Sequence, residues 1–129
     1  MSLASVGGAL IEETNLGKDD REEILSRFVK PNKDILILSI LGERPMCGYD
    51  LIKEIYRRYN VLLSQGAVYP ILYSMEAEGI LRAEYSRGNM KTKFYTLTPK
   101  GKEVMKRKIG NMVYALEYLL SFLKGSCSG

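Results

Sequence analysis

Residues 64–81 read SQGAVYPILYSMEAEGIL, and this stretch decides the fold. Ser64 is a favoured helix N-cap residue, and Gly79 stands where a left-handed residue would end the helix. Between them the apolar residues fall at i, i+3, i+4 and i+7: Val68, Ile71, Leu72 and Met75. The pattern predicts a helix over residues 64–78 with one apolar face.

The opposite face of this helix carries uncharged groups where a surface helix usually has Lys and Glu. Its members are small or can form hydrogen bonds: Gln65, Gly66, Tyr69, Pro70, Tyr73 and Ser74. Such a face, next to an open helix N-terminus, suits contact with DNA phosphates and base edges. The alternative is a plain surface helix with two exposed tyrosines, of which Tyr69 can pack against the neighbouring helix.

Three helices are predicted before this stretch. They cover residues 18–30, 34–41 and 49–59. We expect Pro31 to end the first, Asn32 to cap the second, and Asn60 to end the third. The second helix is apolar nearly all round, which predicts that it is buried. Residues 1–17 contain several glycines and no clear period, so we expect them to be flexible.

After Gly79 the pattern changes from helical to alternating. Leu81, Ala83 and Tyr85 alternate with polar residues, which predicts a half-buried strand over residues 81–86. Residues 94–97 predict a second strand because they are rich in aromatic and β-branched types. The connecting turn gives the hairpin a basic tip, which carries Arg87, Asn89, Lys91 and Lys93.

The last helix is predicted over residues 99–124, with Thr98 as its cap, Pro99 at its first position, and a flexible tail at 125–129. Its apolar residues are spaced by four and three, as in a coiled-coil seam: Met105, Ile109, Met112, Leu116, Leu119 and Leu123. About 25 helical residues span about 37 Å, more than this small domain covers, so we expect a second copy to cover the seam. The helix over 18–30 is expected to contribute to that dimer. The alternative is that the last helix packs only on its own core and on the helix over 18–30.

Basic charge is concentrated directly after the helix over 64–78. Residues 1–81 contain 12 acidic and 9 basic residues, a net charge of −3, whereas residues 82–108 contain 9 basic and 2 acidic residues, a net charge of +7. Such a segment is typical of a phosphate-binding surface, although an ordinary solvated face gives the same count.

The composition argues against an enzyme and against a metal site. The chain has 129 residues, one domain's worth, with no His and with two cysteines, Cys47 and Cys127, that form no CxxC pair. Acid–base catalysis lacks its usual side chain and zinc lacks its usual ligands, so we expect no metal and no cofactor. There is no apolar run of membrane-spanning length and no signal-peptide pattern at the start, so we expect a cytoplasmic protein.

The helices over 34–41, 49–59 and 64–78 are followed by a hairpin with a basic tip. This is the order of a winged helix–turn–helix domain, here residues 31–98. The fold class is therefore mainly α with a small two-stranded β-hairpin. Four motifs resemble those of the PadR family of transcriptional regulators: GYDLI at 48–52, GAVYPIL at 66–72, MEAEGIL at 75–81 and YTLTPKG at 95–101. The resemblance covers residues 35–123, although Met75 stands where leucine is usual. The helix over 18–30 is an addition to the shorter members.

The resemblance implies a ligand-responsive repressor that dimerises through its C-terminal helix. We therefore predict a homodimeric, sequence-specific regulator that binds a pseudo-palindromic operator in double-stranded DNA. The expected DNA contacts are Ser64, Gln65, Gly66, Ala67, Tyr69, Pro70, Tyr73, Arg87, Asn89, Lys91 and Lys93. The alternative is a winged-helix protein–protein interaction module without sequence-specific DNA binding.

Three aromatic residues of the last helix, Tyr114, Tyr118 and Phe122, are a candidate pocket for a small aromatic effector. They are expected to widen the apolar seam, since aromatic residues at helical spacing more often belong to a core than to a ligand site.

Overall fold

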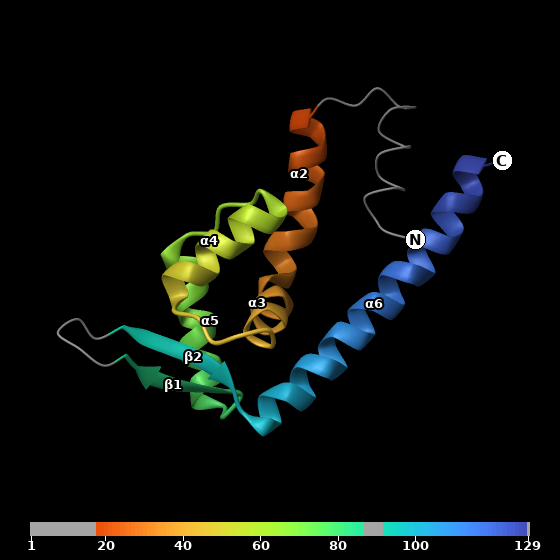
Figure 1. Cartoon of the computed structure of the whole chain (residues 1–129). Coiled ribbons are helices and arrows are strands. Elements are labelled where there is room, and N and C mark those ends of the chain that lie inside the picture. Colours follow the sequence, from red (N-terminus) through yellow and green to blue (C-terminus); the bar gives the residue numbers. More distant parts are fainter. Residues whose placement is uncertain (1–17, 87–91, 129) are drawn as a thin grey trace.

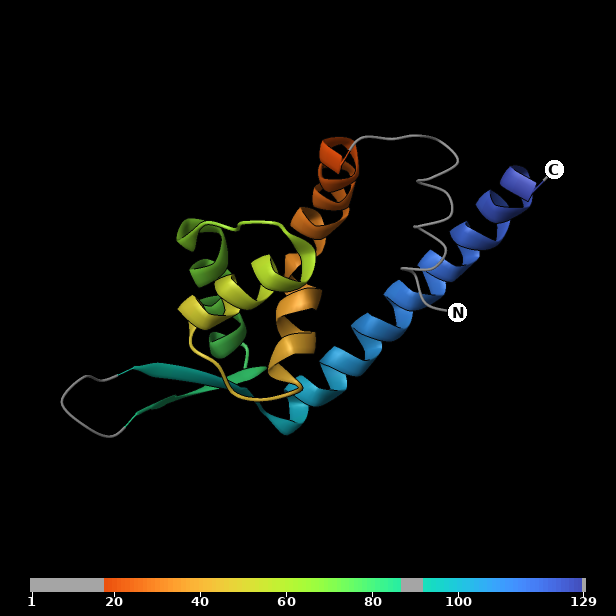
Figure 2. The same ribbon diagram turned by 45° about the horizontal axis from the view of Figure 1, so that its top comes forward.

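The structure, a computed structural model, describes residues 18–86 and 92–128. Its elements are α2 (Lys18–Val29), a 3₁₀ turn (Lys30–Asn32), α3 (Lys33–Leu41), α4 (Gly48–Tyr59), α5 (Gln65–Ala77), β1 (Leu81–Tyr85), β2 (Lys93–Leu97) and α6 (Pro99–Ser128). In Figures 1 and 2, α3, α4, α5 and the hairpin pack into one body, and α2 and α6 extend from it as two diverging arms. The mainly α fold with a two-stranded hairpin is confirmed. The predicted flexible segment at residues 1–17 lies outside the described residues.

One apolar core holds the body together. Its most deeply buried side chains come from α3, α4, α5 and β2: Ile37, Leu38, Ile40, Leu51, Ile55, Val68, Leu72 and Tyr95. Val104 joins this core from the first turns of α6. The helical periods of α4 and α5 predicted these inward faces, because buried positions on a helix recur every three or four residues.

The connection between α2 and α3 is tighter than predicted. The α-helix ends at Val29, before Pro31 as expected, and the 3₁₀ turn leads directly into α3. Asn32 occupies the N-cap position of α3 as predicted, but its side chain forms no capping hydrogen bond there. Its side-chain amide donates instead to the carbonyl oxygen of Phe28 at 2.8 Å, since the end of α2 leaves carbonyl groups without helical partners.

The ends of α4 and α5 follow the capping rules. Asn60 ends α4 with a φ of 57°, and Gly79 follows α5 with a φ of 76°; both residue types tolerate the left-handed region. Ser64 Oγ accepts a hydrogen bond from the Ala67 amide at 3.1 Å, which confirms the predicted cap. Cys47 Sγ accepts the corresponding bond at the start of α4, a role that we did not predict.

β2 is paired on both of its edges near the core. β1 and β2 are antiparallel, with Tyr85 opposite Lys93. On its other edge β2 pairs with Met46: the Tyr95 amide donates to the Met46 carbonyl at 2.8 Å, and the Met46 amide donates back at 3.2 Å. Tyr85 was expected on the half-buried face, but it is 63% exposed, because the hairpin extends beyond the helices before its tip (Figure 1).

α6 is attached to the body by its first turns. Thr98 Oγ1 accepts from the Gly101 amide at 3.0 Å, as expected of a cap, and the Thr98 amide donates to the Ile80 carbonyl at 3.1 Å. Gly101 is buried against that carbonyl, and a Cβ there would overlap the oxygen. The start of α6 therefore packs directly on the backbone that links α5 to β1.

α6 then runs to Ser128, past the end predicted at residue 124. Gly125 does not break it, because one glycine in a helix costs only about 1 kcal/mol relative to alanine. Ser126 Oγ donates to the Phe122 carbonyl at 3.2 Å within this last stretch. No helix in residues 18–86 and 92–128 is both long enough and apolar enough to cross a membrane.

Candidate nucleic-acid interface

The first turns of α5 present an open, uncharged surface. Gln65, Gly66, Pro70 and Tyr73 are exposed, and Ala67 is half-buried. A Cβ at Gly66 would meet only Ser64 Oγ, at 3.9 Å, so another molecule can approach the backbone closely here. The positive end of the helix dipole lies at the same place, which favours contact with an anion. Of the six residues predicted on this face, all but Tyr69 are exposed.

Tyr69 is the member of this face that packs inside the protein. Its ring lies against Gly48 at the start of α4, where an added Cβ would be 2.6 Å from Cζ and 2.8 Å from the hydroxyl oxygen. The Tyr73 ring follows, with 6.0 Å between the two ring centroids. The packing alternative for Tyr69 therefore holds for its ring, and a role in binding DNA stays a prediction for this residue.

Of the four residues expected at the hairpin tip, Arg87, Asn89 and Lys91 lie outside the described residues. Lys93 is described, and it is not at the tip. It is the first residue of β2, and its ammonium group forms an ion pair with Glu76 of α5 at 3.0 Å. This contact was not predicted, although the alternation through Tyr95 and Leu97 places Lys93 on the inward side of the strand.

The surroundings of Lys93 strongly favour its charged form. Its Nζ lies 5.3 Å from the ring centroid of Tyr73 and 5.2 Å from that of Tyr95. The hydrogen bond to Glu76 raises the pKa of Lys93 well above its usual range. Burial raises the pKa of Tyr95 as well. Lys93 thus contacts side chains of both α5 and β2.

Several cations of the basic segment 82–108 bond within the protomer. Arg82 pairs with Glu84 at 3.0 Å, and Lys100 Nζ donates to the Glu78 carbonyl at 2.7 Å, at the C-terminus of α5. The charge count of this segment therefore overstates the positive charge it offers to a ligand. Other exposed cations in its described part lie on α6: Lys102, Lys106 and Arg107.

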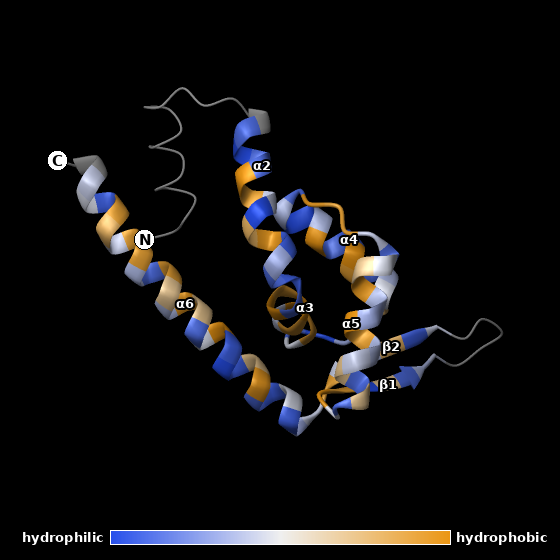
Figure 3. Cartoon of the chain, turned by 180° about the vertical axis from the view of Figure 1, so that it is seen from behind, coloured by the Kyte–Doolittle hydropathy of each residue, from blue (hydrophilic) through white to orange (hydrophobic). Residues whose placement is uncertain are grey.

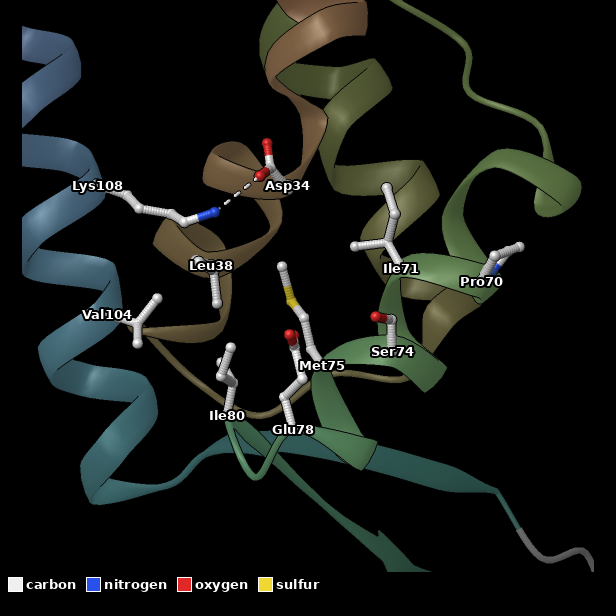
Figure 4. Close-up of a pocket in the computed structure, with 10 residues that line it drawn as sticks. All are labelled: Asp34, Leu38, Pro70, Ile71, Ser74, Met75, Glu78, Ile80, Val104 and Lys108. Carbon is white, nitrogen blue, oxygen red and sulfur yellow. Dashed lines mark hydrogen bonds and ion pairs between the residues drawn. The ribbon is translucent and has the colours of Figure 1, made fainter.

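A pocket of about 330 Å³ lies behind α5, between α3 and α6 (Figure 4). Its apolar lining includes Leu38, Met75 and Val104, and at its edge Lys108 Nζ pairs with Asp34 Oδ2 at 3.2 Å. Because these two charges neutralise each other, the pocket offers no unbalanced charge from that pair. The pocket lies where α5, the helix expected to contact DNA, faces α6.

The far part of α6 has an apolar face that is left uncovered by residues 18–86 and 92–128, the part of the chain that the structure describes. Apolar segments recur along the helix (Figure 3), and Leu119 and Leu123 are 55% and 63% exposed. A second hollow, of about 430 Å³, lies between this helix and the α2–α3 arm and is lined by Phe28 and Leu116 among others. In the described residues α6 does not pack along the length of α2, because the two arms diverge (Figures 1 and 2).

The three aromatic residues proposed as an effector pocket form a row on α6. Ring centroids are 6.2 Å apart for Tyr114 and Tyr118, and 5.3 Å apart for Tyr118 and Phe122. Tyr114 is two residues from both Met112 and Leu116, so it lies on the opposite side of the helix from the seam. The row winds toward the seam only at Phe122. None of the three lines either of the two hollows described above.

Comparison with known proteins points to one family. The model of the transcriptional regulator PadR-like family matches residues 37–107, more than half of the chain. A PadR family transcription regulator from Clostridium difficile is 29% identical, with a TM-score of 0.65, over 71% of this chain and 98% of its own. The comparison with curated proteins gave no match.

Two further solved structures are similar in fold. A PadR family transcriptional regulator from Eggerthella lenta is 23% identical, with a TM-score of 0.68, over 81% of this chain and 93% of its own. Bacillus subtilis PadR, solved in complex with operator DNA, is 22% identical, with a TM-score of 0.55, over 59% of this chain and 45% of its own.

Proposed function

The chain belongs to the PadR-like family of transcriptional regulators, which are not enzymes, and we propose that it is a homodimeric repressor of the cytoplasm that binds a pseudo-palindromic operator. The observation that carries the proposal is the exposed face of α5, which has no charged side chain from Ser64 to Met75 and begins at an open helix N-terminus. Such a face can enter a major groove without repelling phosphates or stranding a charge.

The dimer part of the proposal rests on the uncovered seam of α6. Leu116, Leu119 and Leu123 are exposed in the protomer, and α2 presents Leu25 and Phe28 to solvent. A second α6 that enters the space between the two arms would cover both surfaces. The two α5 helices would then contact half-sites about 34 Å apart, one turn of DNA.

We assign the DNA contacts by position. Gln65 and Tyr73 have exposed side chains on α5 and are candidates for base or phosphate contacts. Ser64, Gly66, Ala67 and Pro70 would let the backbone of the first turn approach the DNA. Arg87, Asn89 and Lys91 remain proposed contacts of the hairpin to phosphates or a minor groove.

The test is a comparison of binding to DNA that flanks the protein's own gene, first by footprinting and then by fluorescence anisotropy. Gln65→Ala should lower the preference for the footprinted site over unrelated DNA by about 5- to 100-fold, the usual range for one base contact. Lys91→Ala should weaken binding to all sequences and lower the slope of log K against log salt by about 0.9. Arg21→Ala removes the same charge on α2, far from the hairpin (Figure 1), and should change neither.

Two outcomes would refute the proposal. One is a wild-type protein that shows no preference among oligonucleotides at low ionic strength. The other is a protein that stays monomeric at working concentrations. A protein–protein interaction module, the alternative function, predicts the first outcome together with binding to an acidic partner protein.

A small aromatic effector is the remaining part of the proposal. The exposed row of Tyr114, Tyr118 and Phe122 supports it, because exposed aromatic rings can stack with planar ligands; Tyr114 and Tyr118 are stacked, and Phe122 is tilted against Tyr118. Tyrosine fluorescence titrated with planar aromatic compounds should change saturably, and should do so less in Tyr118→Leu. A linear, unsaturable response would remove the effector from the proposal.

A further inference from the structure

Lys93 connects the two elements that are proposed to contact DNA. It lies at the start of β2, on the same side of the strand as Tyr95, and its Nζ is 3.0 Å from Glu76 Oε1 on α5. The same ammonium group lies over the rings of Tyr73 and Tyr95, at 5.3 Å and 5.2 Å from their centroids. One cation therefore contacts three side chains from two elements.

This contact lies beyond the point where the hairpin is bonded to the rest of the body. At Tyr95 the strand is held by β1 and, on its other edge, by the two backbone hydrogen bonds to Met46. Lys93 lies two residues farther toward the tip, where the opposite residue, Tyr85, is already exposed. A bond to α5 at this point holds the start of β2 against the helix.

Lys93 is also poorly placed to neutralise a DNA phosphate. Its side chain is only 30% exposed, and a carboxylate already pairs with its charge. A phosphate would have to displace Glu76 and leave that carboxylate without its partner close to the DNA, which is unfavourable.

We propose that the contact of Lys93 with Glu76, Tyr73 and Tyr95 is a latch that fixes the angle between α5 and the hairpin. Lys93 is then a positioning residue for DNA binding and not a phosphate ligand. This inference rests on the proposed function, since it assumes that α5 and the hairpin contact the same duplex.

The direction in which one substitution changes DNA affinity separates the two roles. Glu76→Gln breaks the ion pair and removes a negative charge. If Lys93 only positions the hairpin, affinity should fall about three- to tenfold; if Lys93 is a phosphate ligand, the variant frees it and affinity should rise. Glu78→Gln, two residues along the chain, makes the same change of charge at an exposed side chain and supplies the effect of charge alone.

The salt dependence provides a second measure. Lys93→Met should weaken binding by a similar factor with an unchanged slope of log K against log salt, whereas loss of a phosphate contact lowers the slope by about 0.9. The double variant Glu76→Lys with Lys93→Glu keeps the net charge and restores an ion pair. It should regain most of the affinity that Lys93→Glu alone loses.

A measurement on the free protein separates failure of the latch from failure of the proposed function. The ε-methylene protons of Lys93 lie near two ring faces, so their NMR signals should be shifted upfield in the wild type and less so in Glu76→Gln. Any one of three results would overturn the latch and leave the proposed DNA binding of the wild type intact. They are random-coil shifts in the wild type, an affinity that rises more in Glu76→Gln than in the Glu78→Gln control, and a reduced salt slope in Lys93→Met. A wild type with the expected shifts but no DNA binding would overturn the proposed function and the positioning role together.

Discussion

Replacing Gly101 with alanine should loosen the attachment of α6 to the winged-helix body. The new Cβ would overlap the carbonyl oxygen of Ile80 and lie 3.1 Å from the carbonyl carbon. Both are backbone atoms, so no side chain can rotate away to relieve the overlap. The first turn of α6 has to move, and the hydrogen bond from the Thr98 amide to the same carbonyl, 3.1 Å long, would lengthen with it.

The size of the effect follows from three contributions. Overpacking at a buried position costs about 1–3 kcal/mol, and loss of a backbone hydrogen bond costs about 0.5–1.5 kcal/mol. Alanine recovers about 1 kcal/mol because it is a better helix former than glycine. The free energy of unfolding should therefore fall by about 2 kcal/mol, which lowers the Tm of a domain of this size by about 8 °C.

Gly110 provides a matched control in the same helix. A Cβ at Gly110 would meet no atom within 4 Å, so Gly110→Ala gains the helix propensity alone and should raise the Tm by about 4 °C. Both variants and the wild type are compared by differential scanning calorimetry at one protein concentration, since a dimer melts at a concentration-dependent temperature. If Gly101→Ala melts at or above the wild type while Gly110→Ala behaves as expected, the close packing of Gly101 on Ile80 is refuted.

Three further substitutions test other contacts. Leu119→Lys should give a monomer in light scattering at micromolar concentration, because it places a charge in the uncovered seam. Ser121→Lys, on the opposite side of α6, should stay dimeric. If both variants are dimeric, the seam is not the dimer interface. Ser64→Ala should lower the free energy of unfolding in urea by about 1 kcal/mol through loss of the cap, and an unchanged value would argue against it. Hydrogen bonds from neighbouring arginines, Arg57 first, hold the pKa of Glu54 at about 2. A depressed carboxyl pKa stabilises the fold above its unfolded value of 4.5 and ceases to do so as the pH falls through the folded value. The Tm difference between wild type and Glu54→Gln should therefore shrink between pH 5 and pH 2, and a constant difference would count against the pairing.

Local rules predicted most of the helical body. Val68 and Leu72 on α5 were expected inside from their spacing alone, since a helix repeats its buried face every three or four residues, and both are buried. Ser64 was identified as a cap from its residue type and position. These features depend on residues close together in the chain, so the sequence reports them directly.

The features that sequence reasoning missed depend on contacts between distant segments. Gly48 gives space to the ring of Tyr69, and Met46 forms a backbone bridge with Tyr95. No local pattern signals either one. Lys93 is a different case: it was counted as a cation of the tip, although its alternation with Tyr95 placed it on the inward side of β2. Charge was given more weight than strand periodicity, and the structure favours the periodicity.

In the proposed dimer, the joint at the start of α6 would link dimer formation to DNA binding. In a dimer held by α6, the distance between the two α5 helices depends on the angle between α6 and the body of each protomer. The contacts that hold this angle include the packing of Gly101 on the Ile80 carbonyl and the ion pair of Lys108 with Asp34 at the edge of the pocket in Figure 4. A tilt of α6 by a few degrees at this joint is enlarged along a helix of 30 residues, about 45 Å long. In such a dimer the distance between the two α5 helices would depend on the packing of a glycine far from the proposed DNA-binding face, and any ligand that entered the pocket would act on the same angle.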